Sequence, residues 1–167
     1  MKRFAFLLVT LLSAASCNDD ITGLGPPSDP AKETFAASLG VDISSMSKTT
    51  SGVYYKDIVV GSSTAPEVTG KTDTVRVTYA GYLKDGTLFD SRANTLLAPS
   101  SLIAGFRDGM VGMREGGKRK IVIPSALGYG GRSQKNPLTG RITIPRQATL
   151  VFDIELLKVY NPVPAPV

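Results

Sequence analysis

The chain has 167 residues, enough for one domain with short additions. It contains a single cysteine and no histidine. These counts exclude a Ser-His-Asp or Cys-His catalytic site, a zinc site of histidine and cysteine ligands, and an intrachain disulfide. The formal net charge is +5, and residues 51–167 hold 15 of the 19 basic side chains. The function must therefore use backbone groups, carboxylates, hydroxyls, aromatic rings or simple shape.

The first residues have the pattern of an export signal. Lys2 and Arg3 precede nine mostly apolar residues at 4–12, and four small residues follow. A membrane-spanning helix needs roughly 20 apolar residues, so this segment is too short to span a bilayer and is typical of a secretory signal. We therefore expect residues 1–16 to be a signal peptide and the protein to be exported.

Cys17 directly follows the small residues and is the only thiol of the chain. This arrangement resembles a bacterial lipoprotein signal, in which the cysteine becomes the first mature residue and carries lipid. The resemblance implies a protein of the bacterial cell envelope that is anchored to a membrane through lipid on Cys17, at the periplasmic face or the cell surface. The alternative is an ordinary cleaved signal that leaves a free thiol.

The segment after Cys17 is predicted to be a flexible tether, because residues 18–30 are rich in Asp, Gly and Pro. Phe35, Leu39 and Ile43 have the spacing of one helix face and predict a short helix within it. The expected division is a signal peptide at 1–16, a lipid-anchored tether at 17–50, a globular domain at 51–160 and a proline-rich tail at 161–167.

The middle of the chain has the alternation of β-strands. Residues 75–79 alternate apolar and polar side chains, and residues 150–156 repeat the pattern with apolar side chains at every second position. Asp85 and Gly86 predict a turn, because both residue types tolerate a positive φ. The predicted strands are 53–60, 75–79, 118–123 and 150–156.

One short helix is predicted between the strands. Phe106, Met110 and Met113 are spaced to share one helix face, although Gly109 and Gly112 have poor helix propensity. These glycines are explained if the helix packs closely against a sheet. Several antiparallel strands with one short helix predict an α+β domain.

Three runs of residues identify a family. They are 75–91 (VRVTYAGYLKDGTLFDS), 123–130 (IPSALGYG) and 144–156 (IPRQATLVFDIEL). Together they resemble the FKBP-type peptidyl-prolyl cis–trans isomerases over residues 51–160. The resemblance implies a curved antiparallel β-sheet wrapped around one short α-helix and rotation of X–Pro bonds without a cofactor or metal. It also implies proline-containing polypeptide clients and macrolide immunosuppressant-type ligands. No nucleic acid partner is expected, because an exported protein lacks access to nucleic acid.

The resemblance also implies an aromatic pocket. Tyr79 and Phe152 match the aromatic walls, and Phe89 matches the phenylalanine of the family's Phe-Asp pair. Phe106 takes the position of the pocket floor, where the family most often has tryptophan. The smaller ring implies a wider pocket.

The remaining matches bring polar and aliphatic groups to this pocket. Asp90 completes the Phe-Asp pair, and Tyr129 matches the tyrosine of the rim. Leu102 matches an aliphatic wall, Ile103 a backbone N–H donor to the substrate, and Ile144 an aliphatic contact before the last strand.

The segment between positions 89 and 102 is shorter than in typical members and lacks their aromatic side chains, so Leu96 or Leu97 is expected to substitute.

Rotation about an X–Pro bond breaks no covalent bond, so the absence of histidine and of a catalytic thiol is no objection to this activity. For the same reason we expect Asp90 to act electrostatically or structurally and not as a general base.

Two other functions remain open. A chaperone or binding module with little isomerase activity would follow from the smaller floor residue and the shortened segment. A surface lipoprotein that binds envelope or host polymers would use a basic face, although a solvated surface is the simpler interpretation. The residues of this expected basic face are Lys118, Arg119, Lys120, Arg132, Lys135, Arg141 and Arg146.

Overall fold

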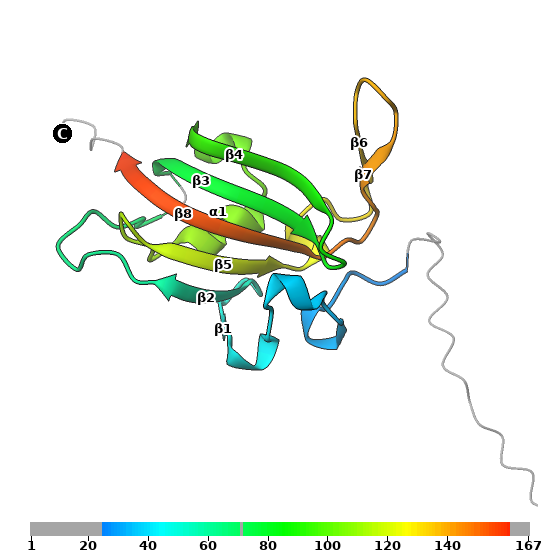
Figure 1. The fold of residues 1–167 in the computed structure, drawn as a ribbon, viewed down its shortest axis with the longest axis horizontal. Coiled ribbons are helices and arrows are strands. Elements are labelled where there is room, and N and C mark those ends of the chain that lie inside the picture. Colours follow the sequence, from blue (N-terminus) through cyan, green and yellow to red (C-terminus); the bar gives the residue numbers. More distant parts are fainter. Residues whose placement is uncertain (1–24, 71, 161–167) are drawn as a thin grey trace, which may run out of the picture.

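A six-stranded antiparallel sheet curves around one short helix in the computed structural model, which describes residues 25–70 and 72–160 (Figure 1). The predicted fold is confirmed, while the expected signal peptide, Cys17 and proline-rich tail lie outside the described residues. No helix within the described ranges is long and apolar enough to cross a membrane. In sheet order the strands are β1 (Ser47–Lys48), β2 (Tyr54–Val59), β5 (Lys118–Ile123), β8 (Leu150–Tyr160), β3 (Thr74–Leu83) and β4 (Leu88–Leu97).

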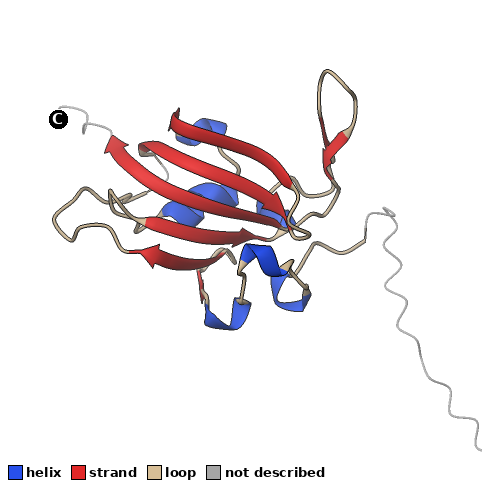
Figure 2. Ribbon diagram, in the orientation of Figure 1, coloured by secondary structure: helices blue, strands red, loops and turns tan. Residues whose placement is uncertain are grey.

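Short elements connect and flank this sheet (Figure 2). The α-helix α1 (Ala104–Met110) crosses the concave face, and a two-stranded hairpin of β6 (Gln134–Lys135) and β7 (Ile142–Ile144) projects from one end. Five single-turn 3-10 helices complete the structure: η1 (Pro30–Lys32), η2 (Ala37–Leu39), η3 (Ile43–Ser45), η4 (Pro99–Ser101) and η5 (Ser125–Leu127).

The alternation of the sequence gives the sheet its two faces. β3 and β8 pair antiparallel from Thr74 opposite Tyr160 to Leu83 opposite Leu150. The apolar side chains on every second position point to the concave face, where Val75 and Leu156 are fully buried. All four predicted strands are present, with each end at most four residues from its expected position.

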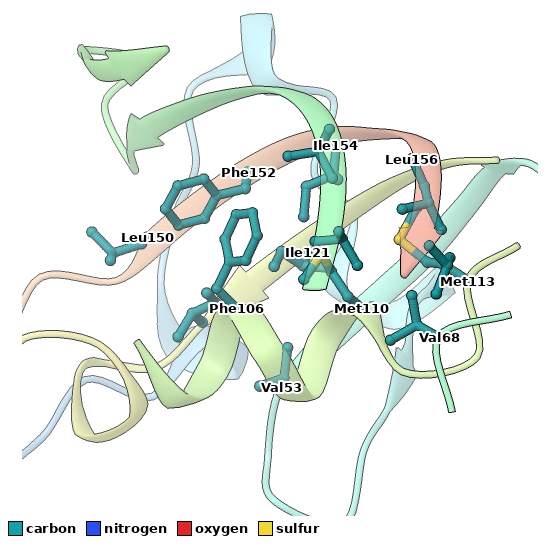
Figure 3. Packing of buried hydrophobic residues seen from close by; sticks show 14 of the residues in the cluster. Val53, Val68, Phe106, Met110, Met113, Ile121, Leu150, Phe152, Ile154 and Leu156 are labelled. Atoms are coloured by element: carbon teal, nitrogen blue, oxygen red, sulfur yellow. The ribbon is translucent and has the colours of Figure 1, made fainter. Parts of the chain in front are cut away.

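Side chains of the helix pack directly beneath the strands of the sheet (Figure 3). The close approach is possible because the helix carries glycine where it touches the strands. A Cβ atom at Gly105 would collide with Cγ2 of Ile123, and one at Gly109 would lie 3.0 Å from Ile121. The predicted reason for Gly109 is therefore confirmed. The reason predicted for Gly112 is wrong: α1 ends at Met110, and Gly112 has a φ of +81° in the following turn, with no atom near its missing side chain.

The segment expected to be a tether packs against the convex face of the sheet from Phe35 onward. Leu39 is 5% exposed and forms a second apolar cluster with Tyr54, Val122 and Val151. The helix expected here is replaced by η2 and η3, because Gly40 adopts a left-handed conformation that ends η2 after one turn. Residues 35–48 thus pack against the folded domain, which was expected to begin at residue 51.

One side chain expected on a basic surface is buried. The Arg119 guanidinium pairs with Asp57 through hydrogen bonds of 2.7 and 3.0 Å and donates to the carbonyl oxygens of Gly109 and Val111. A buried cation requires such partners, so Arg119 serves to join the end of α1 to the sheet. Its neighbours also have acidic partners, as Lys118 pairs with Glu155 and Lys120 with Asp153.

Replacing Gly105 with alanine tests the close approach of the helix. We expect Gly105→Ala to lower the free energy of unfolding by about 1–3 kcal/mol, because overpacking against Ile123 outweighs the better helix propensity of alanine. Denaturant unfolding monitored by circular dichroism measures this. The matched control is Gly70→Ala, at a position with open space around the missing Cβ. Equal stability of the two variants would contradict the packing argument.

Candidate functional site

A cavity of about 140 Å³ opens between the concave face of the sheet, the start of α1 and the loop before β6. It gathers eight of the nine residues that the sequence predicted for the pocket, from five separate parts of the chain. The exception is Ile144, which does not line the cavity. The lining residues are Tyr79, Phe89, Asp90, Leu97, Ser101, Leu102, Ile103, Phe106, Tyr129 and Phe152.

Four aromatic rings form the floor and walls of this cavity. Phe152 stands at their centre: its ring centroid is 5.0 Å from that of Phe106, 5.5 Å from Phe89 and 6.1 Å from Tyr79. The two closest pairs are edge-to-face, the arrangement that the ring quadrupoles favour. Phe106 is only 3% exposed, so its ring is held in place at the base of the cavity.

The rings meet over β3 because Gly81 leaves room for them. A Cβ atom at this position would lie 2.6 Å from Cε1 of Phe152 and 2.8 Å from Cζ of Phe89. A glycine inside a strand often marks such a close approach, so this signal was available in the sequence and was missed.

A hydrogen bond joins the two polar side chains at the wall. The Tyr79 hydroxyl donates to Oδ2 of Asp90 at 2.6 Å, which links β3 to β4. Burial raises the pKa of Tyr79 to about 12, and the hydrogen bond to Asp90 and the negative charge of its carboxylate add to the rise. Burial and the charge of Asp90 also raise the pKa of Tyr129. Both tyrosines therefore remain protonated hydrogen-bond donors at neutral pH.

The segment between β4 and α1 supplies the aliphatic side of the cavity. Leu102 and Ile103 line it directly before the helix, with Ile103 as the N-cap residue. Of the two leucines expected to substitute for aromatic contacts, Leu97 lines the cavity, whereas Leu96 is 53% exposed on the other face of β4. Ser101 was missed, because it belongs to the single turn η4 and no periodic pattern marks it.

Ile144 belongs to the core. β7 alternates from an exposed Ile142 to Ile144, which is 4% exposed and packs in the main apolar cluster. Its side chain therefore has a packing role, and the substrate contact implied for it stays a prediction.

Comparisons with known proteins identify the family of the chain. A family model described as FKBP-type peptidyl-prolyl cis-trans isomerase matches residues 65–157, more than half of the chain. The FK506-binding protein of Neisseria meningitidis serogroup C is 44% identical over 100 residues, which cover 56% of this chain and 84% of that protein. The FKBP-type peptidyl-prolyl cis-trans isomerase FkpA of Escherichia coli K12 is 39% identical over 140 residues, which cover 81% of this chain and 45% of FkpA.

Solved structures show the same fold. A peptidyl-prolyl cis-trans isomerase from Pseudomonas syringae superimposes with a TM-score of 0.63 at 26% identity, over 75% of this chain and 87% of that one. The crystal structure of FkpA from Escherichia coli gives a TM-score of 0.56 at 35% identity, over 68% of this chain and 51% of that one. The chain belongs to the FKBP-type peptidyl-prolyl cis-trans isomerase family and is a peptidyl-prolyl isomerase.

Proposed function

We propose that the chain accelerates X–Pro rotation in exported polypeptides by enclosing the proline in the aromatic cavity and stabilising the twisted amide. The observation that carries this proposal is the cavity itself, in which four aromatic rings meet one tyrosine–carboxylate hydrogen bond. A macrolide immunosuppressant-type ligand would compete for the same cavity.

The chemistry needs shape more than reactive groups. The barrier to rotation is about 18–20 kcal/mol and arises because twisting destroys the resonance of the amide. An enzyme lowers it by binding the twisted form better than either planar form. A buried floor at Phe106 excludes water from the proline ring, and a dry environment disfavours the more dipolar planar amide.

Polar groups at the edge would orient the peptide. The Tyr129 hydroxyl and the Ile103 N–H are donors for peptide carbonyl groups. Asp90 already accepts from Tyr79, so we assign it to holding that ring and to placing negative charge at the wall. No step in this mechanism moves a proton to or from the substrate.

A low-activity chaperone or binding module on the same fold remains the second candidate, because phenylalanine stands at position 106 where the family most often has tryptophan. Polymer binding through the basic face is not proposed. Three of its seven cations are engaged with Asp57, Asp153 and Glu155.

The floor residue tests the role of the cavity. We expect Phe106→Ala to reduce kcat/KM strongly and to lower the free energy of unfolding by about 3–5 kcal/mol, because it removes a buried ring. Phe106→Trp should preserve or raise kcat/KM, since the larger ring extends into the cavity. A protease-coupled assay with proline peptides measures both variants.

The matched control for the floor residue is Met113→Ala. Met113 is 2% exposed in the same core but does not line the cavity, so this variant should lose stability and keep its kcat/KM. If Phe106→Ala stays folded and fully active, the catalytic site lies elsewhere.

The pH dependence tests whether protons are transferred. The raised pKa values of Tyr79 and Tyr129 extend their protonated forms to higher pH, and the chain has no histidine. We therefore expect kcat/KM to be constant between about pH 6 and 9. A steep rise or fall within this range, with the domain still folded, would show a titrating catalytic group that this mechanism does not contain.

We further propose that Cys17 carries the lipid that anchors the enzyme to a membrane of the cell envelope. The support is its place directly after the export signal and its uniqueness as a thiol. Two or more acyl chains give a stable anchor, whereas one is marginal. Cys17→Ser should move the protein from the membrane fraction to the soluble fraction with unchanged isomerase activity. If the variant sediments with membranes to the same extent as the wild type, the lipid anchor is contradicted.

A further inference from the structure

The loop that carries Tyr129 is organised around a buried serine. The Ser125 carbonyl oxygen accepts hydrogen bonds from the N–H groups of Gly128 at 3.0 Å and Gly130 at 2.9 Å, the two neighbours of Tyr129. Gly130 has a φ of +55°, so the turn uses a conformation that glycine adopts readily. Ser125 itself is fully buried. The position of Tyr129 at the cavity edge thus depends on where Ser125 is held.

Ser125 is held by a residue 97 positions earlier in the chain. Its N–H donates to the Ser28 hydroxyl at 2.7 Å, and the Ser28 N–H donates to the Ser125 hydroxyl at 2.8 Å. Figure 1 shows the first described residues, in blue, at the end of the sheet from which the β6–β7 hairpin projects. This reciprocal pair fastens the start of the domain to the Tyr129 loop.

Gln147 closes the network from the loop before β8. Its Oε1 accepts from the Ser125 hydroxyl at 2.8 Å, its N–H donates to the Gly130 carbonyl at 2.8 Å, and its Nε2 donates to the Gly25 carbonyl at 3.4 Å. Gln147 has a φ of +54°, which side-chain-bearing residues rarely adopt. Surrounding contacts must maintain such a conformation, and such strained residues cluster at functional sites.

We propose that residues 25–28, which we call the N-terminal clasp, position Tyr129 for substrate binding. The inference rests on the proposed function, in which the Tyr129 hydroxyl orients the peptide. Ser28 is a positioning residue that acts through Ser125. Without its hydroxyl the Ser125 N–H loses its partner, and the loop gains conformations in which Tyr129 is misplaced. When only a fraction of molecules is competent to bind, the apparent affinity falls by that fraction.

Ser28→Ala and Ser28→Thr in the full chain test the clasp. In Ser28→Ala we expect a several-fold increase in KM with little change in kcat, and faster hydrogen exchange at the amides of Gly128 and Gly130. Ser28→Thr keeps the hydroxyl and should restore the wild-type KM and the wild-type exchange rates at Gly128 and Gly130. The matched control is Leu39→Ala, which removes a buried contact of the same N-terminal segment on the convex face. It should lower the global stability without changing KM or placing the Tyr129 loop in faster exchange than the rest of the domain.

Three results would overturn the clasp: wild-type KM in Ser28→Ala, unchanged exchange at Gly128 and Gly130, or the same KM increase in Leu39→Ala. The last would show that general destabilisation accounts for the effect. If the wild-type chain rotates no X–Pro bond, the proposed function fails, and the exchange rates at these two glycines alone then decide whether the clasp orders the loop.

Discussion

The close approach of α1 to the concave face of the sheet is the constraint on which the site depends. Gly105 and Gly109 remove the side chains that would hold the helix away from Ile123 and Ile121. With the helix in this position, Phe106 reaches the ring of Phe152 on the central strand β8. A larger separation would fill the space with solvent or with other side chains, and the aromatic floor would not form.

The floor of the cavity is therefore part of the core. Phe152 and Phe106 belong to the main apolar cluster and line the cavity at the same time, so the packing that stabilises the domain also sets the shape of the site. The one strong polar contact, from Tyr79 to Asp90, joins two neighbouring strands. Such a site suits a reaction that needs a fixed, dry surface and no nucleophile.

Sequence reasoning predicted the parts of the fold that have one buried face. β3 and β8 alternate cleanly because one side faces the core, whereas β4 is exposed along most of its length and pairs through two irregular registers, so it carries little periodic signal. The N-terminal segment resembled a tether because its few apolar residues are separated by polar ones. They still find partners, since Val122 and Val151 leave an apolar patch on the convex face.

The pocket residues were predictable because three motifs carry most of them. Ile144 also lies in a matching motif, and its side chain is buried in the core. Arg119 lies in a run of basic residues, so the sequence predicts a surface position for it. Its partner Asp57 is distant in the sequence and becomes its neighbour only in the folded domain. Ser28 and Ser125 are 97 positions apart in the sequence, and no local pattern predicts the hydrogen bonds between them.

In the proposed mechanism, the cavity catalyses rotation through shape and fixed hydrogen bonds, without proton transfer. The most direct test is kcat/KM for a proline peptide measured in H₂O and in D₂O at matched acidity, with the chemical step limiting the rate. We expect the same value in both solvents, because no exchangeable proton moves when the amide twists. A substantially slower reaction in D₂O would show that a side chain donates or removes a proton in the transition state, and would contradict this mechanism.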